Sequence, residues 1–245
     1  MSSAITLKRC IFCGAEGVSE EHIIAGWAFR ALARSRKPGP NFAGTFMAPD
    51  QLKVEADEPV QTAGVTCKPC NNGWLSLIDN DAARVLKPLI QGASEVTLDA
   101  FGQTAFAAWI YKCALIFDAA QHGTDGELAS LREGFMESKQ AGPGCIMYAG
   151  SAGAPAPFEF PGLDEKLGLR LFGVRPVNGT VRLIVNGEES QHRIPGYQIL
   201  LGNLCVYLGG QVAPITPESL VGFEQVWPAR DEPVTVRPWI VGEGS

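Results

Sequence analysis

Two Cys-x-x-Cys pairs constrain this chain more than any other feature of its sequence. Cys10 pairs with Cys13, and Cys67 pairs with Cys70. Two such pairs supply the four-thiolate tetrahedral donor set of structural Zn²⁺ sites, and each short loop lets backbone N–H groups point at the sulfurs. The pairs lie far apart in the chain, but the entropy cost of closing a loop grows only logarithmically with its length. The sequence therefore predicts one structural zinc ion held by these four cysteines.

The number and setting of the cysteines favour metal binding over a disulfide framework. The chain has 7 cysteines, an odd number that cannot all pair. Cys113, Cys145 and Cys205 stand alone in apolar segments, which is typical of small buried hydrophobes. The N-terminus lacks a signal-peptide pattern and no apolar run approaches about 18 residues, so we expect a reducing, cytoplasmic location and no membrane span. A competing hypothesis is that residues 67–70, Cys-Lys-Pro-Cys, form a redox dithiol, although no strand-helix pattern is expected around them.

Charge is distributed unevenly along the chain. The formal net charge of -6 argues against non-specific coating of nucleic acid, which needs clustered Lys and Arg. The segment from Lys8 to Lys37 nevertheless contains six basic residues against three glutamates. We therefore expect a local basic face in the first third of the chain.

Apolar periodicity predicts the elements of the first third. A short helix is expected over Ile23–Arg34 and short strands within 52–56 and 62–67. A second helix is expected from Asn71 onward, with Asn71 or Asn72 as its N-cap and Pro88 limiting its end. Its apolar face is made by Leu75, Ile78, Ala82, Val85 and Leu89.

The later sequence predicts helices followed by a sheet. The segment 101–119 is apolar nearly all round and should form a central, buried helix, and an amphipathic helix is expected over 127–139. Strand-like runs cover 168–174, 179–185, 197–210 and 233–241, with Asn178-Gly179 as the turn of a hairpin. The expected fold class is α+β, divided into residues 1–95 and 96–245, with central helices and a C-terminal antiparallel sheet.

Three segments occur in the order found in a known family. They are Cys-Ile-Phe-Cys-Gly at 10–14, Glu-Glu-His-Ile-Ile at 20–24, and Val-Thr-Cys-Lys-Pro-Cys-Asn-Asn-Gly-Trp at 65–74. This order resembles the HNH endonucleases, the ββα-metal or His-Me finger superfamily, in the bacterial variant framed by two zinc knuckles. The resemblance covers about the first 90 residues. It implies that residues 1–95 form a zinc-bound ββα-metal module, with a region of unassigned role after it.

The resemblance also implies roles for particular residues. His22 would be the general base, Glu21 and Asn71 would hold a catalytic Mg²⁺ or Mn²⁺, and Asn72 is a neighbouring candidate. A neutral imidazole can accept a proton from water near neutral pH, and the metal would neutralise charge on the scissile phosphate. The implied function is metal-dependent hydrolysis of phosphodiester bonds in nucleic acid, with DNA expected rather than RNA.

Several positions depart from the family pattern. Ala25 replaces a common proline, Ala63-Gly64-Val65 replaces an Asn-Leu pair, and Leu75 cannot be a second ligand from the helix. The metal site is therefore either incomplete or completed by Asp79 or Asp81, although a solvated helix face is the expected place for both acids. The alternative function is therefore a non-catalytic zinc-finger module that binds nucleic acid or a protein.

Overall fold

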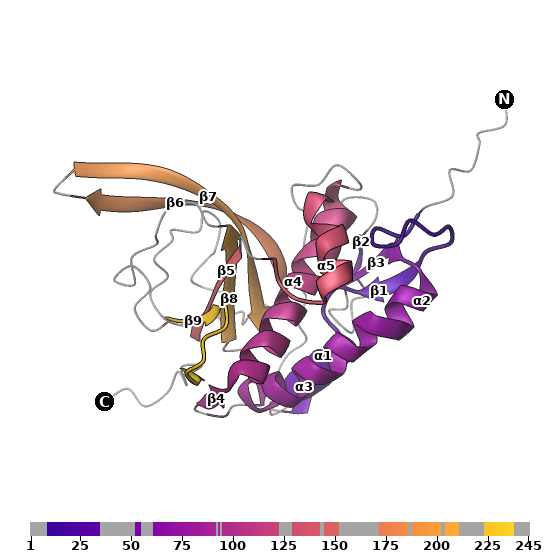
Figure 1. Ribbon diagram of the computed structural model, residues 1–245, viewed down its shortest axis with the longest axis horizontal. Helices are drawn as coiled ribbons and strands as arrows, with labels where there is room; N and C mark the ends of the chain where they lie inside the picture. The colour runs from indigo at the N-terminus through magenta and orange to yellow at the C-terminus, as the bar shows by residue number, and fades with distance from the viewer. Residues whose placement is uncertain are drawn as a thin grey trace.

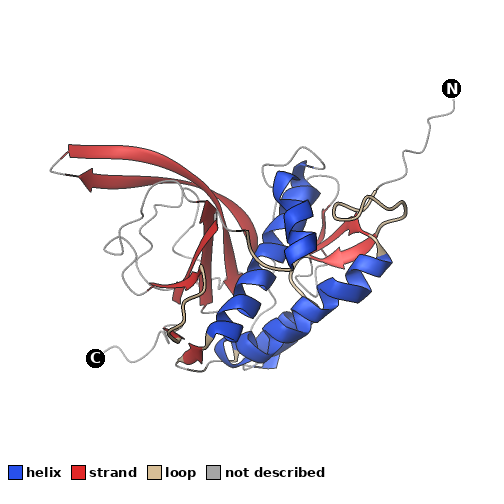
Figure 2. Ribbon diagram, viewed as in Figure 1, coloured by secondary structure: helices blue, strands red, loops and turns tan. Residues whose placement is uncertain are grey.

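Helices and small antiparallel sheets make up the chain, which confirms the α+β class (Figures 1 and 2). The computed structural model describes residues 9–34, 52–54, 61–91, 93, 95–122, 129–142, 145–151, 172–185, 188–201, 204–210 and 223–237. The elements are β1 (Ser19–His22), α1 (Gly26–Arg34), β2 (Leu52–Val54), β3 (Gln61–Thr66), α2 (Lys68–Cys70), the π-helical turn η1 (Asn71–Leu75), α3 (Ser76–Ile90), β4 (Val96–Leu98), α4 (Ala100–His122), the 3₁₀ turn η3 (Ala129–Leu131), α5 (Arg132–Ser138), β5 (Cys145–Ser151), β6 (Phe172–Val185), β7 (Glu188–Leu201), β8 (Leu204–Gly210), β9 (Phe223–Trp227) and β10 (Val234–Val236).

The N-terminal sheet has three strands in the order β1-β3-β2, and both pairings are antiparallel. Both expected strands, β2 and β3, are present, and β3 leads directly into the helical run α2–η1–α3. Helix α1 begins at Gly26 instead of Ile23, because Ile23 and Ile24 are buried in the core as the chain leaves β1. Strand β1 thus lies beside β3, the strand that leads into the helix carrying Cys70.

The start of the long helix differs from the expectation that Asn71 or Asn72 caps it. The helical run begins at Lys68, with Cys67 extended at the N-cap and Pro69 in the first turn. Asn71 itself has helical geometry, with φ -60° and ψ -56°. Proline is tolerated in a first turn because its missing N–H would have no intrahelical partner there. The knuckle, and not the asparagine pair, therefore starts the helix.

Helix α4 is the central core element, as its apolar sequence predicts. Figure 1 shows it between the five-stranded sheet and helices α1 and α3, and it contacts α3, β3 and β9. Trp109 near its middle has no exposed surface. Contrary to expectation, the window Ala100–Ala120 is long and apolar enough, by length and composition alone, to cross a membrane. Its two charged residues, Lys112 and Asp118, do not lower the mean hydropathy of the window below that of a membrane span. Of that window, 83% is buried inside the fold, as in a core helix.

The C-terminal sheet has five antiparallel strands in the order β6-β7-β8-β5-β9. The expected hairpin at Asn178-Gly179 is wrong, because β6 continues through this pair and places it opposite Pro195 and Ile194 of β7. Val185 pairs with Glu188, so the chain reverses between them, where a second Asn-Gly pair occupies positions 186–187 outside the described residues. The pairing of β6 with β7 along its whole length therefore excludes Asn178-Gly179 as the turn.

Other expectations for the later chain hold in part. The helix expected over 127–139 is shorter, with η3 followed by α5, and its first residues lie outside the described part. The lone cysteines Cys113 and Cys145 are buried, as small hydrophobes should be, whereas the side chain of Cys205 lies outside the description. The basic segment from Lys8 to Lys37 also extends beyond the described residues.

A buried glutamine connects α4 to the C-terminal segment. Gln103 Nε2 donates to the carbonyl oxygens of Leu98, Arg230 and Glu232 at 3.2, 3.3 and 2.9 Å. Its Oε1 accepts from the Arg230 N–H at 2.7 Å. These bonds fix the loop that joins β9 to β10, and β10 pairs with β4 in a separate two-stranded sheet.

Gln103→Ala is expected to destabilise the fold by about 1–3 kcal/mol, because it leaves buried backbone groups without their side-chain partner. Urea unfolding at neutral pH measures this change in the free energy of unfolding. Gln140→Ala, at an exposed position, is the matched control and should stay within about 0.5 kcal/mol of the unmodified protein. Equal stability of the two variants would contradict a structural role for the Gln103 amide.

Candidate metal centre

The first knuckle is a tight turn that presents Cys10 and Cys13. Cys10 N–H donates to Ala15 O at 2.8 Å, and Gly14 N–H donates to Cys10 O at 2.9 Å. Gly14, directly after Cys13, has φ +70°, a left-handed conformation that glycine adopts without steric cost. Ile11 N–H donates to Val65 O at 3.0 Å and so ties this knuckle to the end of β3.

The second knuckle joins β3 to the helical run. Cys67 is extended, with φ -82° and ψ 156°, and its carbonyl accepts the Asn71 N–H at 2.9 Å. Cys70 ends α2 one turn later. Because Ile11 bonds to Val65, two residues before Cys67, the two knuckles lie next to each other.

All four cysteine sulfurs lie within 4.8 Å of one another. The Cys13 and Cys67 sulfurs are 3.5 Å apart, too far for a disulfide. A tetrahedral zinc site with Zn–S bonds of about 2.3 Å has sulfur-to-sulfur edges of about 3.8 Å. Cys10, Cys67 and Cys70 are buried and Cys13 is exposed. The cluster fits a four-coordinate metal such as zinc, as the sequence predicts.

The surroundings of the thiols also suit a bound cation. Burial raises the pKa of the Cys10 thiol, but backbone hydrogen bonds from Cys13, Cys67 and Phe12 outweigh burial and lower it from 9.0 to about 7. These bonds confirm that backbone N–H groups point at a knuckle sulfur. Burial raises the pKa of Cys70 from 9.0 to about 12, with the neighbouring Cys13 and Cys67 adding to the rise. A divalent cation would hold all four sulfurs as thiolates despite their burial and mutual repulsion.

The surroundings of Cys67 and Cys70 do not favour the hypothesis that these two residues form a redox dithiol. Contrary to expectation, Cys67 does lie between a strand, β3, and a helix. A reactive dithiol needs a thiol with a lowered pKa, however, and burial raises the pKa of Cys67. Two further cysteines also lie within reach, which a dithiol does not require.

The structure places His22 at the end of β1, where its side chain is exposed. Its neighbour Glu21 lies in the same strand opposite Ala63, and the position of the Glu21 side chain is outside the description. The other two histidines lie in regular elements far along the chain: His122 ends α4, and His192 lies within β7.

Asn71 and Asn72 lie in η1, directly after the second knuckle, with Asn71 half-buried and Asn72 exposed. This π-helical turn contains Gly73, whose φ of -93° and ψ of -115° depart from helical geometry. Single π-helical turns inside α-helices occur frequently at functional sites. Both asparagine positions are therefore accessible at an irregular turn beside the cysteine cluster.

Strand register separates His22 from the knuckle along the sheet. His22 is opposite Thr62, whereas Ser19 is opposite Thr66, next to Cys67. At about 3.3 Å per residue, Thr62 and Cys67 are about 16 Å apart along β3. The helical run that carries Asn71 must fold back along the sheet for His22 and Asn71 to approach one another.

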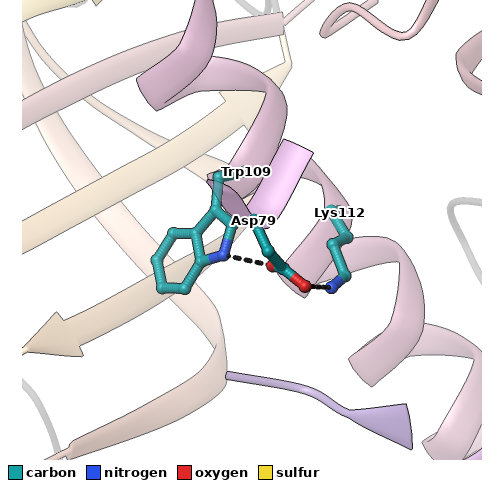
Figure 3. A network of polar contacts seen from close by, with 3 residues as sticks. All are labelled: Asp79, Trp109 and Lys112. Carbon is teal, nitrogen blue, oxygen red and sulfur yellow. Dashed lines mark hydrogen bonds and ion pairs between the residues drawn. The ribbon is translucent and has the colours of Figure 1, made fainter. Parts of the chain in front are cut away.

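Asp79 is already engaged within the protein and is not a solvated acid (Figure 3). Its carboxylate accepts the Trp109 Nε1–H and the Lys112 ammonium, both at 2.8 Å, and its side chain is only 17% exposed. The expectation of a solvated helix face is thus wrong for Asp79, because α4 covers this side of α3 and brings a buried lysine to it. Asp81 does lie on the exposed face, 3.6 Å from Arg84.

Trp74 is a residue at this centre that the sequence analysis did not single out as functional. Its indole nitrogen is buried and has no hydrogen-bond partner. Burial raises the pKa of the Cys70 thiol, and the Trp74 side chain partly opposes that rise. Its ring packs against Phe12 and Phe135 at centroid distances of 5.0 and 5.5 Å. The signal in the sequence is the spacing of four between Cys70 and Trp74, which places the two on one face of a helical segment.

Among the described side chains, the cysteine cluster is the one group of three or more His, Cys, Asp or Glu donors close enough to share a metal. Comparisons with protein-family models, with curated proteins and with solved structures find no match.

Proposed function

We propose that the four cysteines hold one structural zinc ion and that the unit they frame is a metal-dependent nuclease. The observation that carries the proposal is the connection at the cysteine cluster: β1 pairs with β3, and β3 passes through Cys67 into a helix. Two strands followed by a helix is the arrangement that the resemblance to HNH endonucleases implies. Zinc would give this small unit a stability that its short strands do not supply.

The exposed polar side chains of this unit support a hydrolytic role. His22 ends β1 in an exposed position, and Asn72 is exposed in the π-helical turn. In the proposal His22 accepts a proton from the attacking water. Glu21 and Asn71 would hold Mg²⁺ or Mn²⁺, which supplies charge neutralisation at the scissile phosphate. Asp79 takes no part as a ligand, because Lys112 and Trp109 occupy its carboxylate.

A non-catalytic binding module is the second candidate, and the strand register favours it. The register places His22 opposite Thr62, five residues along the chain from Cys67, so His22 lies away from the knuckle that Asn71 follows. A zinc-framed module can still bind nucleic acid or a protein with this geometry, since binding does not require a base and a metal at one phosphate.

The proposal predicts that His22→Ala lowers the rate of metal-dependent cleavage by about 10² to 10⁴, because a general base contributes that much to proton transfer. The purified protein is incubated with plasmid, single-stranded DNA and RNA in Mg²⁺, Mn²⁺ or EDTA. Zinc content and melting temperature should remain unchanged, since His22 is exposed and outside the cysteine cluster.

His122→Ala, at the end of α4, serves as the matched control and should cleave at the unmodified rate. Asn71→Ala should instead shift the Mg²⁺ concentration needed for half-maximal cleavage, because it removes a ligand and not the base. Binding of nucleic acid without cleavage under any metal condition would reject the nuclease and support the binding module.

A further inference from the structure

An aromatic side chain packs against one knuckle of the cysteine cluster and follows the other knuckle in the chain. Trp74 follows Cys70 by four residues in the helical run, and its ring meets Phe12, which lies between Cys10 and Cys13, at a centroid distance of 5.0 Å and an interplanar angle of 79°. The tryptophan therefore contacts the turn of one knuckle and follows the other in the chain.

The polar atom of this tryptophan has no conventional partner although it is buried. Trp74 Nε1 is shielded from solvent and has no hydrogen-bond partner in the structure. A buried N–H without an acceptor is unfavourable, and indole N–H groups inside proteins usually find one. The sulfur of Cys70 is the acceptor that the chain offers to this N–H, because Cys70 precedes Trp74 by about one turn of the same helical run. A thiol is a weak acceptor, whereas a metal-bound thiolate accepts hydrogen bonds readily.

A positive charge lies on the same tryptophan. Lys139 Nζ is 4.2 Å from the centroid of the Trp74 ring. Lys139 is the C-cap of α5 and adopts the left-handed conformation, with φ +58°. From the same helix, Phe135 packs on Trp74 at a centroid distance of 5.5 Å. Helix α5 thus brings a cation and an aromatic ring to the cysteine cluster.

We propose that Trp74 is the outer-sphere partner of the metal centre: its indole N–H donates to the Cys70 thiolate, and the Lys139 ammonium over its ring offsets the excess negative charge of a zinc ion bound by four thiolates. Such a centre carries two more negative than positive charges, so a nearby donor and a nearby cation both stabilise the bound state. Zinc binding would at the same time provide the buried indole N–H with an acceptor. Helix α5 would then depend on zinc for its place in the fold.

This inference rests on the zinc ion of the proposed function but not on nuclease activity. The test measures zinc affinity of the full chain by competition with a chromophoric chelator. Trp74→Phe keeps an aromatic ring and removes the N–H, and it should weaken zinc binding about 10-fold, the lower end of the range for outer-shell partners of metal ligands. Lys139→Met should weaken binding less, and by an amount that shrinks as salt is added.

Trp27→Phe is the matched control. Trp27 also has a buried indole nitrogen without a conventional partner, but its ring packs on Trp109, at a centroid distance of 5.3 Å, and not on the cysteine knuckles. Its replacement should leave zinc affinity within about 2-fold of the unmodified protein, since it removes no donor to a ligand.

Cobalt substitution gives a second readout that does not depend on folding stability. Loss of an N–H donor to a ligating sulfur raises the energy of the sulfur electrons, so the sulfur-to-Co²⁺ charge-transfer band of Trp74→Phe should move to longer wavelength. An unmoved band, an unchanged zinc affinity of Trp74→Phe, or an equal loss in Trp27→Phe would overturn the role of Trp74. An unmodified protein that binds no zinc would overturn the zinc proposal together with it.

Discussion

Cys67→Ser is expected to remove the zinc and unfold the N-terminal third of the chain. A metal bound by four thiolates contributes on the order of 10 kcal/mol of folding free energy in small zinc modules. Cys67 is buried, and its sulfur lies within 4.8 Å of the other three, so a serine oxygen cannot replace it as a soft ligand. Elemental analysis should give one zinc per chain for the unmodified protein and a large loss for the variant, with a lowered melting temperature.

Cys145→Ala is the control for this experiment, because it removes a buried cysteine that lies outside the cluster. It should retain zinc and lose only about 1 kcal/mol, the usual effect of a small change in a core. A chelator should reproduce the effect of Cys67→Ser on the unmodified protein. A folded sample that holds no zinc without having met a chelator would reject the assignment of the metal.

Asp79→Ala is expected to destabilise the protein by about 3 kcal/mol, the lower end of the range for breaking a buried ion pair. The substitution removes the carboxylate that balances the fully buried Lys112 ammonium and accepts the Trp109 N–H (Figure 3). The lower end of that range applies because the Asp79 side chain is 17% exposed to solvent and is therefore not fully buried. Chemical unfolding at neutral pH measures the change in the free energy of unfolding.

Asp81→Ala, two positions along the same helix, is the matched control. Its carboxylate is 3.6 Å from the exposed Arg84 side chain, and an exposed pair contributes only about 0–1 kcal/mol. The double variant with Asp79→Ala and Lys112→Met should recover part of the loss, because it removes the charge together with its partner. Equal effects of Asp79→Ala and Asp81→Ala would show that the contacts of Asp79 with α4 do not stabilise the fold.

Two features at the candidate site could be predicted from the sequence because they depend on local spacing and on the chemistry of the residues themselves. Cys10, Cys13, Cys67 and Cys70 have the spacing of two zinc knuckles, and the structure brings their sulfurs together. Gly14 follows the first pair and has the positive φ that glycine adopts readily in such a turn. The burial of Trp109 followed likewise from a helix with almost no polar face.

Other features depended on contacts between distant segments, which a local pattern does not contain. Asp79 looked like a surface acid until α4 placed Lys112 and Trp109 against it. Asn178-Gly179 and the pair at 186–187 are equal turn signals, and only the pairing of β6 with β7 selects between them.

The sequence by itself determined the ligands of the metal centre, because donor type and short-range spacing decide what a knuckle can bind. The tertiary structure decided what surrounds that centre. The register of β1 on β3 sets the position of His22 relative to the knuckle, and the packing of α5 brings Lys139 to Trp74. Register and packing are set by the burial of apolar surface over the whole fold, so no short segment of the sequence contains the information that fixes them.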